Sequence, residues 1–197
     1  MHTEEKPGFE AEALPHLDAV YRFGLRLAQG DTDLAEDLVQ ETFLRGYRSW
    51  ASYTRGTNCR SWLFTICRNV FLRQRERQGR RPETPTSRIE ADVESLASRA
   101  IFDDLQVADP ENTFFDSFVD REVLAEIDRL PDEFRECLVL SDLQGLPYAD
   151  IARVLNIPVG TVKSRLFRGR RLLQRSLYDY AVEMGYIQPS AGSREAG

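Results

Sequence analysis

The chain has 197 residues, of which 42% are hydrophobic and 29% charged, and its formal net charge is −6. This composition suits a globular protein of one domain or two small ones. No run of apolar residues approaches the ~20 that a transmembrane helix needs, so no membrane-spanning helix is expected. The first residues are acidic and lack the basic and apolar segments of a signal peptide, so we expect a cytoplasmic protein.

The three cysteines, Cys59, Cys67 and Cys137, are odd in number and lack C-x-x-C spacing, and His2 and His16 lie far from them. This pattern argues against a zinc site or a disulfide framework. We expect buried apolar thiols, with a redox switch as the alternative. No metal and no other cofactor is predicted.

The first half of the chain has a helical hydrophobic period from about residue 10 to residue 79. A first helix should end at Gly30, and Asp31 or Thr32 can cap a second helix that runs to about Trp50. The segment 52–58 is loop-like. A third long helix is predicted over 59–77, and its core-facing residues should be Trp62, Leu63, Ile66, Val70 and Phe71.

The middle of the chain is rich in acid and proline, which predicts a linker with a short helix around 89–105. Helices follow at about 118–129, 132–143, 147–155 and 159–179, and no segment has a convincing strand period. The prediction is an all-α protein with two small helical domains. Their bounds are 10–81 and 118–180, joined by the acidic linker 82–117 and followed by a C-terminal tail, 181–197.

The net charge hides two basic patches. Residues 60–81 hold seven arginines against one acid, and residues 161–177 hold six basic residues and no acid. Residues 82–128 hold thirteen acids against three arginines. Basic patches of this kind can bind the phosphates of a nucleic acid even when the net charge of the whole chain is negative.

The most informative segment is LPYADIARVLNIPVGTVKSRLFRGRR, residues 146–171, which predicts two short helices joined by a tight turn. In a helix-turn-helix the second helix enters the DNA major groove. Its apolar face would carry Val162, Leu166, Gly169 and Leu173. Its DNA-reading face would carry Thr161, Lys163, Ser164, Phe167, Arg168 and Arg171. Arg165, Arg170 and Arg175 suit phosphate contacts, and the alternative is an ordinary basic surface helix.

Two further patches lie in the first domain. Aromatic residues interleave with arginines over 49–81, a combination typical of single-stranded DNA binding, although tryptophans at helical spacing are also common core residues. The residues concerned are Trp50, Tyr53, Trp62, Phe64, Arg55, Arg60, Arg68 and Arg73, with Asn69 as a further base-reading candidate. An acidic stripe on the second helix favours a basic protein partner or is a solvated face; it comprises Asp33, Glu36, Asp37, Gln40 and Glu41.

In this order, the patches resemble an extracytoplasmic-function (ECF, group 4) sigma factor of bacterial RNA polymerase. DLAEDLVQETFLRGYRSW is similar to region 2.2, RSWLFTICRNVFLRQRERQGRR to regions 2.3 and 2.4, and the segment from Leu130 to Leu173 to regions 4.1 and 4.2. The resemblance covers about residues 10–81 and 118–180. It implies core RNA polymerase (β′ clamp helices and β flap), promoter DNA and an anti-sigma factor as partners.

The resemblance also implies roles for individual residues. Asp37, Gln40, Glu41 and Phe43 would dock on the β′ clamp helices. The DNA-reading face of the second helix in the helix-turn-helix, listed above, would read the −35 element. The melted −10 element would be held by Tyr53, Arg55, Asn58, Arg60, Trp62, Arg68, Asn69 and Arg73.

The C-terminal LLQRSLYDYAVEMGYI resembles the subgroup controlled by zinc-containing, thiol-responsive anti-sigma factors, which favours GGAA-type −35 elements. Ser141 departs from relatives that carry an arginine near the −35 DNA, which puts the −35 sequence in doubt. The rival interpretation is a helix-turn-helix regulator that binds duplex DNA without polymerase, with residues 1–115 as a sensory domain. An enzyme is not expected, because no nucleotide-binding loop, metal-ligand cluster or nucleophile–base pair is evident.

Overall fold

The computed structural model describes residues 8–54, 57–77, 79 and 121–185, and the regular elements within these ranges are all helical. The predicted all-α fold is therefore confirmed. The predicted linker 82–117, its short helix, Arg55 and most of the tail lie outside the described residues. None of the helices in the described ranges is long and apolar enough to span a membrane.

The first unit consists of α1 (Phe9–Ala13), α2 (Leu17–Leu27), α3 (Thr32–Ser49) and α4 (Cys59–Arg77). Local chemistry sets its boundaries. Gly30 has a φ of +88°, which terminates the segment after α2, and the Asp31 carboxylate accepts a hydrogen bond from the Leu34 amide at 3.0 Å to cap α3. The predicted breaks at Gly30 and Asp31 are thus confirmed.

The first predicted helix, expected to run without a break to Gly30, is interrupted. A 3-10 turn over Leu14–His16 contains Pro15 and separates α1 from α2. Proline lacks the amide hydrogen that a continuous α-helix would need at this point, which accounts for the interruption.

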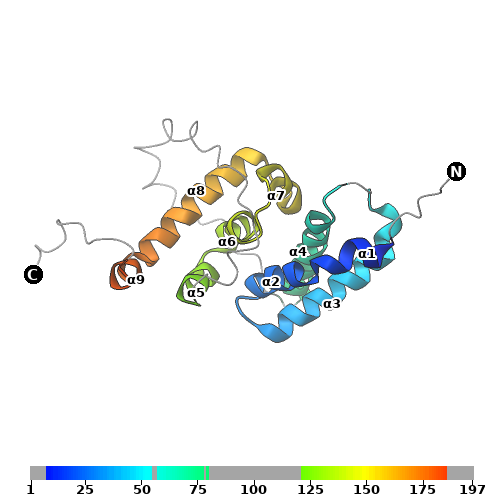
Figure 1. The fold of residues 1–197 in the computed structure, drawn as a ribbon, viewed down its shortest axis with the longest axis horizontal. Coiled ribbons are helices and arrows are strands. Elements are labelled where there is room, and N and C mark those ends of the chain that lie inside the picture. Colours follow the sequence, from blue (N-terminus) through cyan, green and yellow to red (C-terminus); the bar gives the residue numbers. More distant parts are fainter. Residues whose placement is uncertain (1–7, 55–56, 78, 80–120, 186–197) are drawn as a thin grey trace, which may run out of the picture.

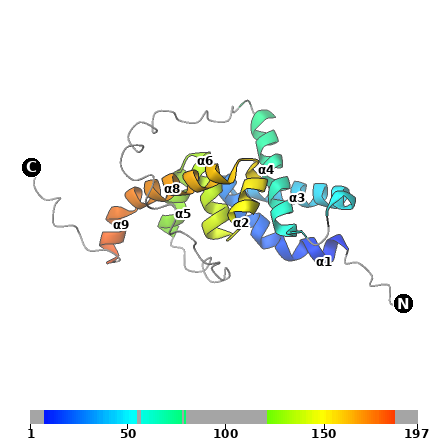
Figure 2. The same cartoon turned by 90° about the horizontal axis from the view of Figure 1, so that it is seen from above.

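The second unit consists of α5 (Arg121–Arg129), α6 (Asp132–Leu138), α7 (Tyr148–Leu155), α8 (Val159–Ser176) and α9 (Tyr178–Glu183). α6 continues into a π-helical turn, Val139–Leu143. The helix predicted over 159–179 divides at Leu177, so its last residues belong to α9. α8 runs outward and carries α9 to the end of the molecule far from the first unit (Figures 1 and 2).

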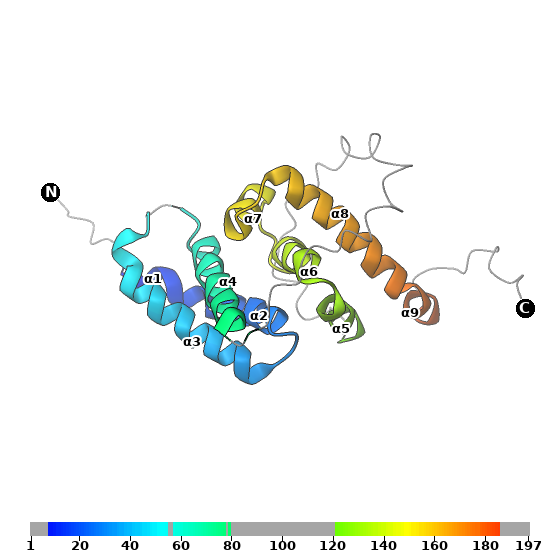
Figure 3. The same ribbon diagram turned by 180° about the vertical axis from the view of Figure 1, so that it is seen from behind.

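The two units pack side by side, with α2 and α4 of the first unit against α5, α6 and α7 of the second (Figures 1 and 3). The packing of α4 on α7 is the most extensive of these contacts. α3 lies on the side of the first unit away from the second unit. This interface was not predicted from the sequence.

Candidate DNA-binding and polymerase-binding surfaces

The helix-turn-helix predicted from the sequence is formed by α7, a short turn and α8. Asn156 ends α7 in the left-handed conformation with a φ of 54°, and Pro158 precedes α8. The predicted apolar face of α8 packs inward, since Val162, Leu166 and Gly169 are buried. The turn and the packing face thus hold α8 as the outer helix of the pair.

The predicted DNA-reading residues lie on α8 as follows. Lys163 and Arg171 are exposed, and the other four are half-buried. The Ser164 hydroxyl donates a hydrogen bond to the Thr161 backbone carbonyl oxygen at 3.0 Å, which ties the Ser164 side chain to the first turn of α8. The set therefore combines two exposed cations, Lys163 and Arg171, with four less exposed residues, one of which is the cation Arg168.

Two arginines assigned to phosphate contacts have carboxylate partners inside the second unit. Arg165 pairs with Glu133 of α6 at 3.1 Å. Arg170 makes two hydrogen bonds to Asp142, at 2.6 and 3.0 Å, and this pairing raises the pKa of Arg170. Both side chains fasten α8 to the preceding elements, and they would have to leave these partners to contact phosphate.

The aromatic residues near the 52–58 loop pack on one another. Trp50 stacks on Tyr53 with ring centroids 4.7 Å apart, and Trp62 lies 5.0 Å from Tyr53. Tyr53 is buried and its hydroxyl donates to the Thr57 carbonyl oxygen at 2.7 Å, while Trp62 is half-buried. In this structure the cluster supports the loop, and only part of its surface is open to a base.

The predicted −10 residues on α4 and at its start divide into two groups. Asn58, Arg60 and Arg68 contact the second unit, whereas Asn69 and Arg73 are exposed beside α3. The second group lines a shallow groove with a volume of about 580 Å³ between α3 and α4. Arg45 and Arg48 of α3 line the same groove, so its walls are strongly basic.

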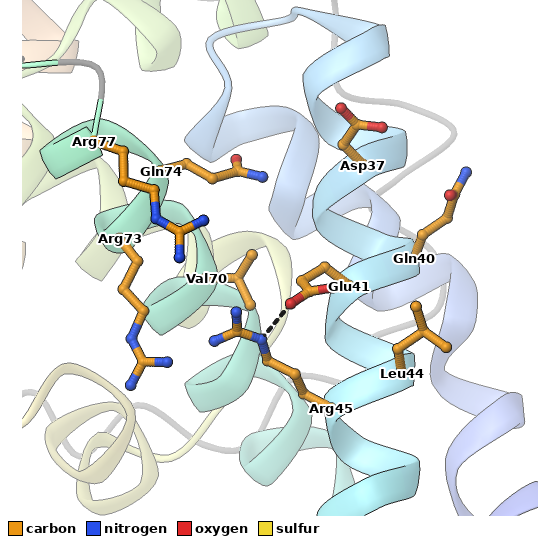
Figure 4. Close-up of a pocket in the computed structure, with 9 residues that line it drawn as sticks. All are labelled: Asp37, Gln40, Glu41, Leu44, Arg45, Val70, Arg73, Gln74 and Arg77. Carbon is orange, nitrogen blue, oxygen red and sulfur yellow. Dashed lines mark hydrogen bonds and ion pairs between the residues drawn. The ribbon is translucent and has the colours of Figure 1, made fainter.

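The predicted polymerase-docking residues lie along α3. Asp37 and Gln40 are exposed, and Gln40 points away from α4 in Figure 4. Glu41 accepts a hydrogen bond from Arg45 at 2.6 Å, on the side that faces α4 (Figure 4). Phe43 is half-buried with its ring edge-on to Phe9, at 6.2 Å, so it has a packing role as well.

Two exposed apolar residues on α3 were not among the predicted polymerase-docking residues. Leu44 is 51% exposed and Tyr47 is 66% exposed. They follow Gln40 by four and seven residues, so all three share one side of α3. Their helical spacing from Gln40 could have identified them from the sequence as part of the same surface.

The described residues contain no cluster of three or more His, Cys, Asp or Glu side chains that could hold a metal ion.

Comparison with protein families gives both units a match. Residues 14–81 match the family described as Sigma-70 region 2, and residues 120–173 match Sigma-70, region 4. The ECF RNA polymerase sigma-E factor of Haemophilus influenzae is 35% identical over 141 residues, covering 72% of this chain and 73% of the relative. The chain belongs to the ECF sigma factors.

Another ECF sigma factor, SigE of Mycolicibacterium smegmatis, is 38% identical over 179 residues. The match covers 90% of this chain but 64% of that relative. The rival interpretation, a regulator with a sensory domain in residues 1–115, is therefore wrong, because this part of the chain contains the Sigma-70 region 2 match.

Solved structures of sigma factors are similar as well. RpoE of Bartonella quintana, in complex with the anti-sigma factor NepR, is 30% identical with a TM-score of 0.63, covering 86% of this ECF sigma factor and 96% of that chain. CnrH, in complex with the cytosolic domain of CnrY, is 20% identical with a TM-score of 0.54, covering 84% of each chain, and supports the fold alone.

Proposed function

We propose that this ECF sigma factor binds core RNA polymerase and directs promoter-specific initiation of transcription. The observation that carries the proposal is the presence, in one chain and in family order, of a region 2 unit and a region 4 unit. α8 reads the −35 element as duplex, and α4 with the loop before it holds the melted −10 strand. The protein acts by binding rather than by catalysing a reaction.

The −35 role rests on the chemistry of α8. Arginine and lysine reach guanine edges in the major groove, serine reaches several bases, and phenylalanine can pack on a thymine methyl group. Lys163 and Arg171 are exposed on α8, and the buried apolar face of α8 keeps the helix fixed on α6 and α7. The predicted GGAA-type −35 element remains a prediction.

The polymerase role rests on the outer side of α3. Asp37 and Gln40 are exposed beside Leu44 and Tyr47, so polar and apolar groups form one continuous surface. A surface with exposed apolar side chains among polar ones is typical of a protein-binding site. The β′ clamp helices would occupy it, and the β flap would contact the second unit.

An anti-sigma factor is the second proposed partner. The similar solved structure of RpoE is a complex with such a protein, the anti-sigma factor NepR. Whether the partner belongs to the zinc-containing, thiol-responsive kind stays a prediction from the C-terminal segment.

The proposed function is tested by run-off transcription with purified bacterial core polymerase on a promoter with a GGAA-type −35 element. A discrete product that depends on the chain is expected. Absence of product together with no co-elution of chain and core on a sizing column would contradict the proposal. Co-elution without product would mean that the promoter sequence is wrong.

Two variants should separate the two surfaces in the same assay. Arg168→Ala should lower promoter-specific transcription about 10-fold or more while core binding stays intact, because a good base contact contributes ~1–3 kcal/mol. Asp37→Arg with Glu41→Arg should abolish core binding and leave α8 unaffected. Equal core binding and equal transcription in both variants would contradict these assignments.

A further inference from the structure

A second groove lies between the middle of α3 and the C-terminal half of α4 and is lined by charges of both signs (Figure 4). Its volume is about 350 Å³, within the range of roughly 300–1,000 Å³ typical of small-molecule sites. Val70, which is 2% exposed, also lines it. We call it the Arg77 groove, and its other lining residues are Asp37, Gln40, Glu41, Leu44, Arg45, Arg73, Gln74 and Arg77.

The α4 side of the Arg77 groove is cationic. Arg73 and Arg77 are exposed and lie about one helical turn apart, and neither pairs with a carboxylate among the described residues. Arg45 of α3 extends toward α4, and its Nε donates to Glu41 at 2.6 Å, so this bond does not use its two Nη groups. Three guanidinium groups thus line one groove, where they can bind the oxygens of more than one phosphate group.

Other positions in the groove offer hydrogen-bond acceptors. Asp37 is exposed on the α3 side. Gln74 points from α4 toward α3 in Figure 4, and its Oε1 atom is buried without a hydrogen-bond donor in the described part of the chain. A buried acceptor without a donor is unfavourable, so a ligand with an N–H group at this point would gain a hydrogen bond that the free protein lacks.

This arrangement of charge separates two classes of phosphate ligand. A DNA strand carries a phosphate at every nucleotide, so the carboxylates of Asp37 and Glu41 would repel it along the α3 side. A free nucleotide carries its phosphates at one end and the N–H groups of its base at the other. Guanine suits the acceptor side, because its N1–H and its N2 amino group are adjacent donors, whereas adenine has only its N6 amino group.

We propose that the Arg77 groove binds a guanosine nucleotide with two or more phosphates. The phosphates contact Arg45, Arg73 and Arg77, and the guanine edge donates to Asp37 and to Gln74 Oε1. The consequence for transcription rests on the proposed function. Since Asp37 also belongs to the proposed polymerase-binding surface, a bound nucleotide and the β′ clamp helices exclude each other.

Binding is measured by fluorescence anisotropy of N-methylanthraniloyl-GDP (mant-GDP) titrated with the full chain. Saturable binding at one site per chain is expected. The adenine analogue, mant-ADP, should bind about tenfold more weakly, because it lacks one of the two donors that face the carboxylate.

Three variants locate the site. Arg77→Glu should weaken mant-GDP binding about tenfold or more, because it places a negative charge beside the phosphates. Arg129→Glu makes the same charge change at an exposed residue outside the groove and should leave the affinity unchanged. Gln74→Met removes the unpaired acceptor at similar volume, and it should weaken mant-GDP binding while the affinity for pyrophosphate, measured by calorimetry, stays the same. Far-UV circular dichroism establishes that each variant is folded.

The competition with polymerase is tested separately. Millimolar GDP should lower the amount of wild-type chain that co-elutes with core polymerase on a sizing column, and Arg77→Glu should resist this effect. Unchanged co-elution of the wild type would overturn the competition. If the chain does not co-elute with core even without GDP, the proposed function fails, whereas the mant-GDP titration still decides whether the groove binds a nucleotide.

The binding site itself would be overturned if mant-GDP did not bind saturably. The same holds if Arg129→Glu weakened binding as much as Arg77→Glu, which would indicate general attraction between charges. Equal affinities for mant-GDP and mant-ADP would overturn the guanine contact with Asp37. If mant-GDP failed to bind while Arg77→Glu and Gln74→Met both weakened binding of a fluorescein-labelled single-stranded DNA, the groove would belong to the DNA strand and the proposal would be wrong.

Discussion

At the residue scale, the three cysteines illustrate how burial controls reactivity. Cys59, Cys67 and Cys137 are all free and buried, as predicted. Burial raises the pKa of Cys67 and of Cys137 to about 12, and that of Cys59 to about 11. Since the thiolate is the reactive form, these residues are core side chains and are inert near neutral pH.

We expect the folded chain to react slowly with Ellman's reagent at pH 8, whereas a Glu36→Cys variant exposes one rapidly reacting thiol.

The pKa of Cys67 in the folded state lies above its ordinary value of 9.0. The folded state therefore binds the thiol proton more tightly, and this contribution to stability is complete below pH 9 and is lost as pH rises toward 12. Urea unfolding between pH 7.5 and 10.5 measures it.

Cys67→Ala is the matched variant for the pH dependence. It should be less stable at all pH values because it leaves a small cavity, but the free energy of unfolding should fall less steeply above pH 9. Rapid reaction of all three thiols in the folded wild type would contradict their assignment as core residues.

At the scale of single elements, α8 depends on a close approach to α6. A Cβ atom at Gly169 would lie 3.0 Å from Leu138 Cδ1 and 3.2 Å from Phe134 Cβ. At Gly24, in α2, a Cβ atom would be in ordinary contact, 3.6 Å from the Ala35 carbonyl oxygen. Gly24 and Gly169, both helical, thus differ in packing and not in secondary structure.

Gly169→Ala should destabilise the protein by about 1 kcal/mol, because overpacking costs ~1–3 kcal/mol and exceeds the ~1 kcal/mol gain in helix propensity. Gly24→Ala should be neutral or stabilising by up to about 1 kcal/mol, since the gain in propensity meets no clash. Urea unfolding compares the two variants. Equal stabilisation of both would mean that α6 and α8 can move apart without cost.

At the scale of the whole molecule, the interface couples two units that belong to different family regions. Arg26, Arg68 and Arg75 each pair with a carboxylate of the second unit, and the side chains of all three are less than 20% exposed. Removing one member of a buried pair costs ~3–5 kcal/mol, because the other charge is left without its partner. We therefore expect the units to unfold together.

Calorimetry of the full chain should show one cooperative transition, and Arg68→Ala should resolve it into two, because Glu136 then loses its partner at the interface. Arg45→Ala is the matched control. Arg45 pairs with Glu41 within the first unit on a half-exposed surface, so its loss should cost ~0–1 kcal/mol and keep a single transition. Two transitions in the wild type would contradict the coupling.

The helices and most of their ends could be predicted from the sequence, because the signals are local. Gly30 and Asp31 act through their own backbone angles and through a capping bond three residues away. The apolar face of α8 follows from helical spacing. The break at Leu14–His16 was missed, since Pro15 is tolerated in the first turn of a helix and the hydrophobic period alone passes through it.

What only the tertiary structure decided is which predicted DNA-binding residues are accessible. The sequence by itself determined that Asn58, Arg60 and Arg68 are polar or cationic and suited to acceptor oxygens. The acceptors that they meet are Gln144, Glu136 and Asp150, which lie 68 to 92 residues away in the chain. No local pattern encodes such a pairing, and a basic side chain binds a carboxylate by the same physics as it binds a phosphate.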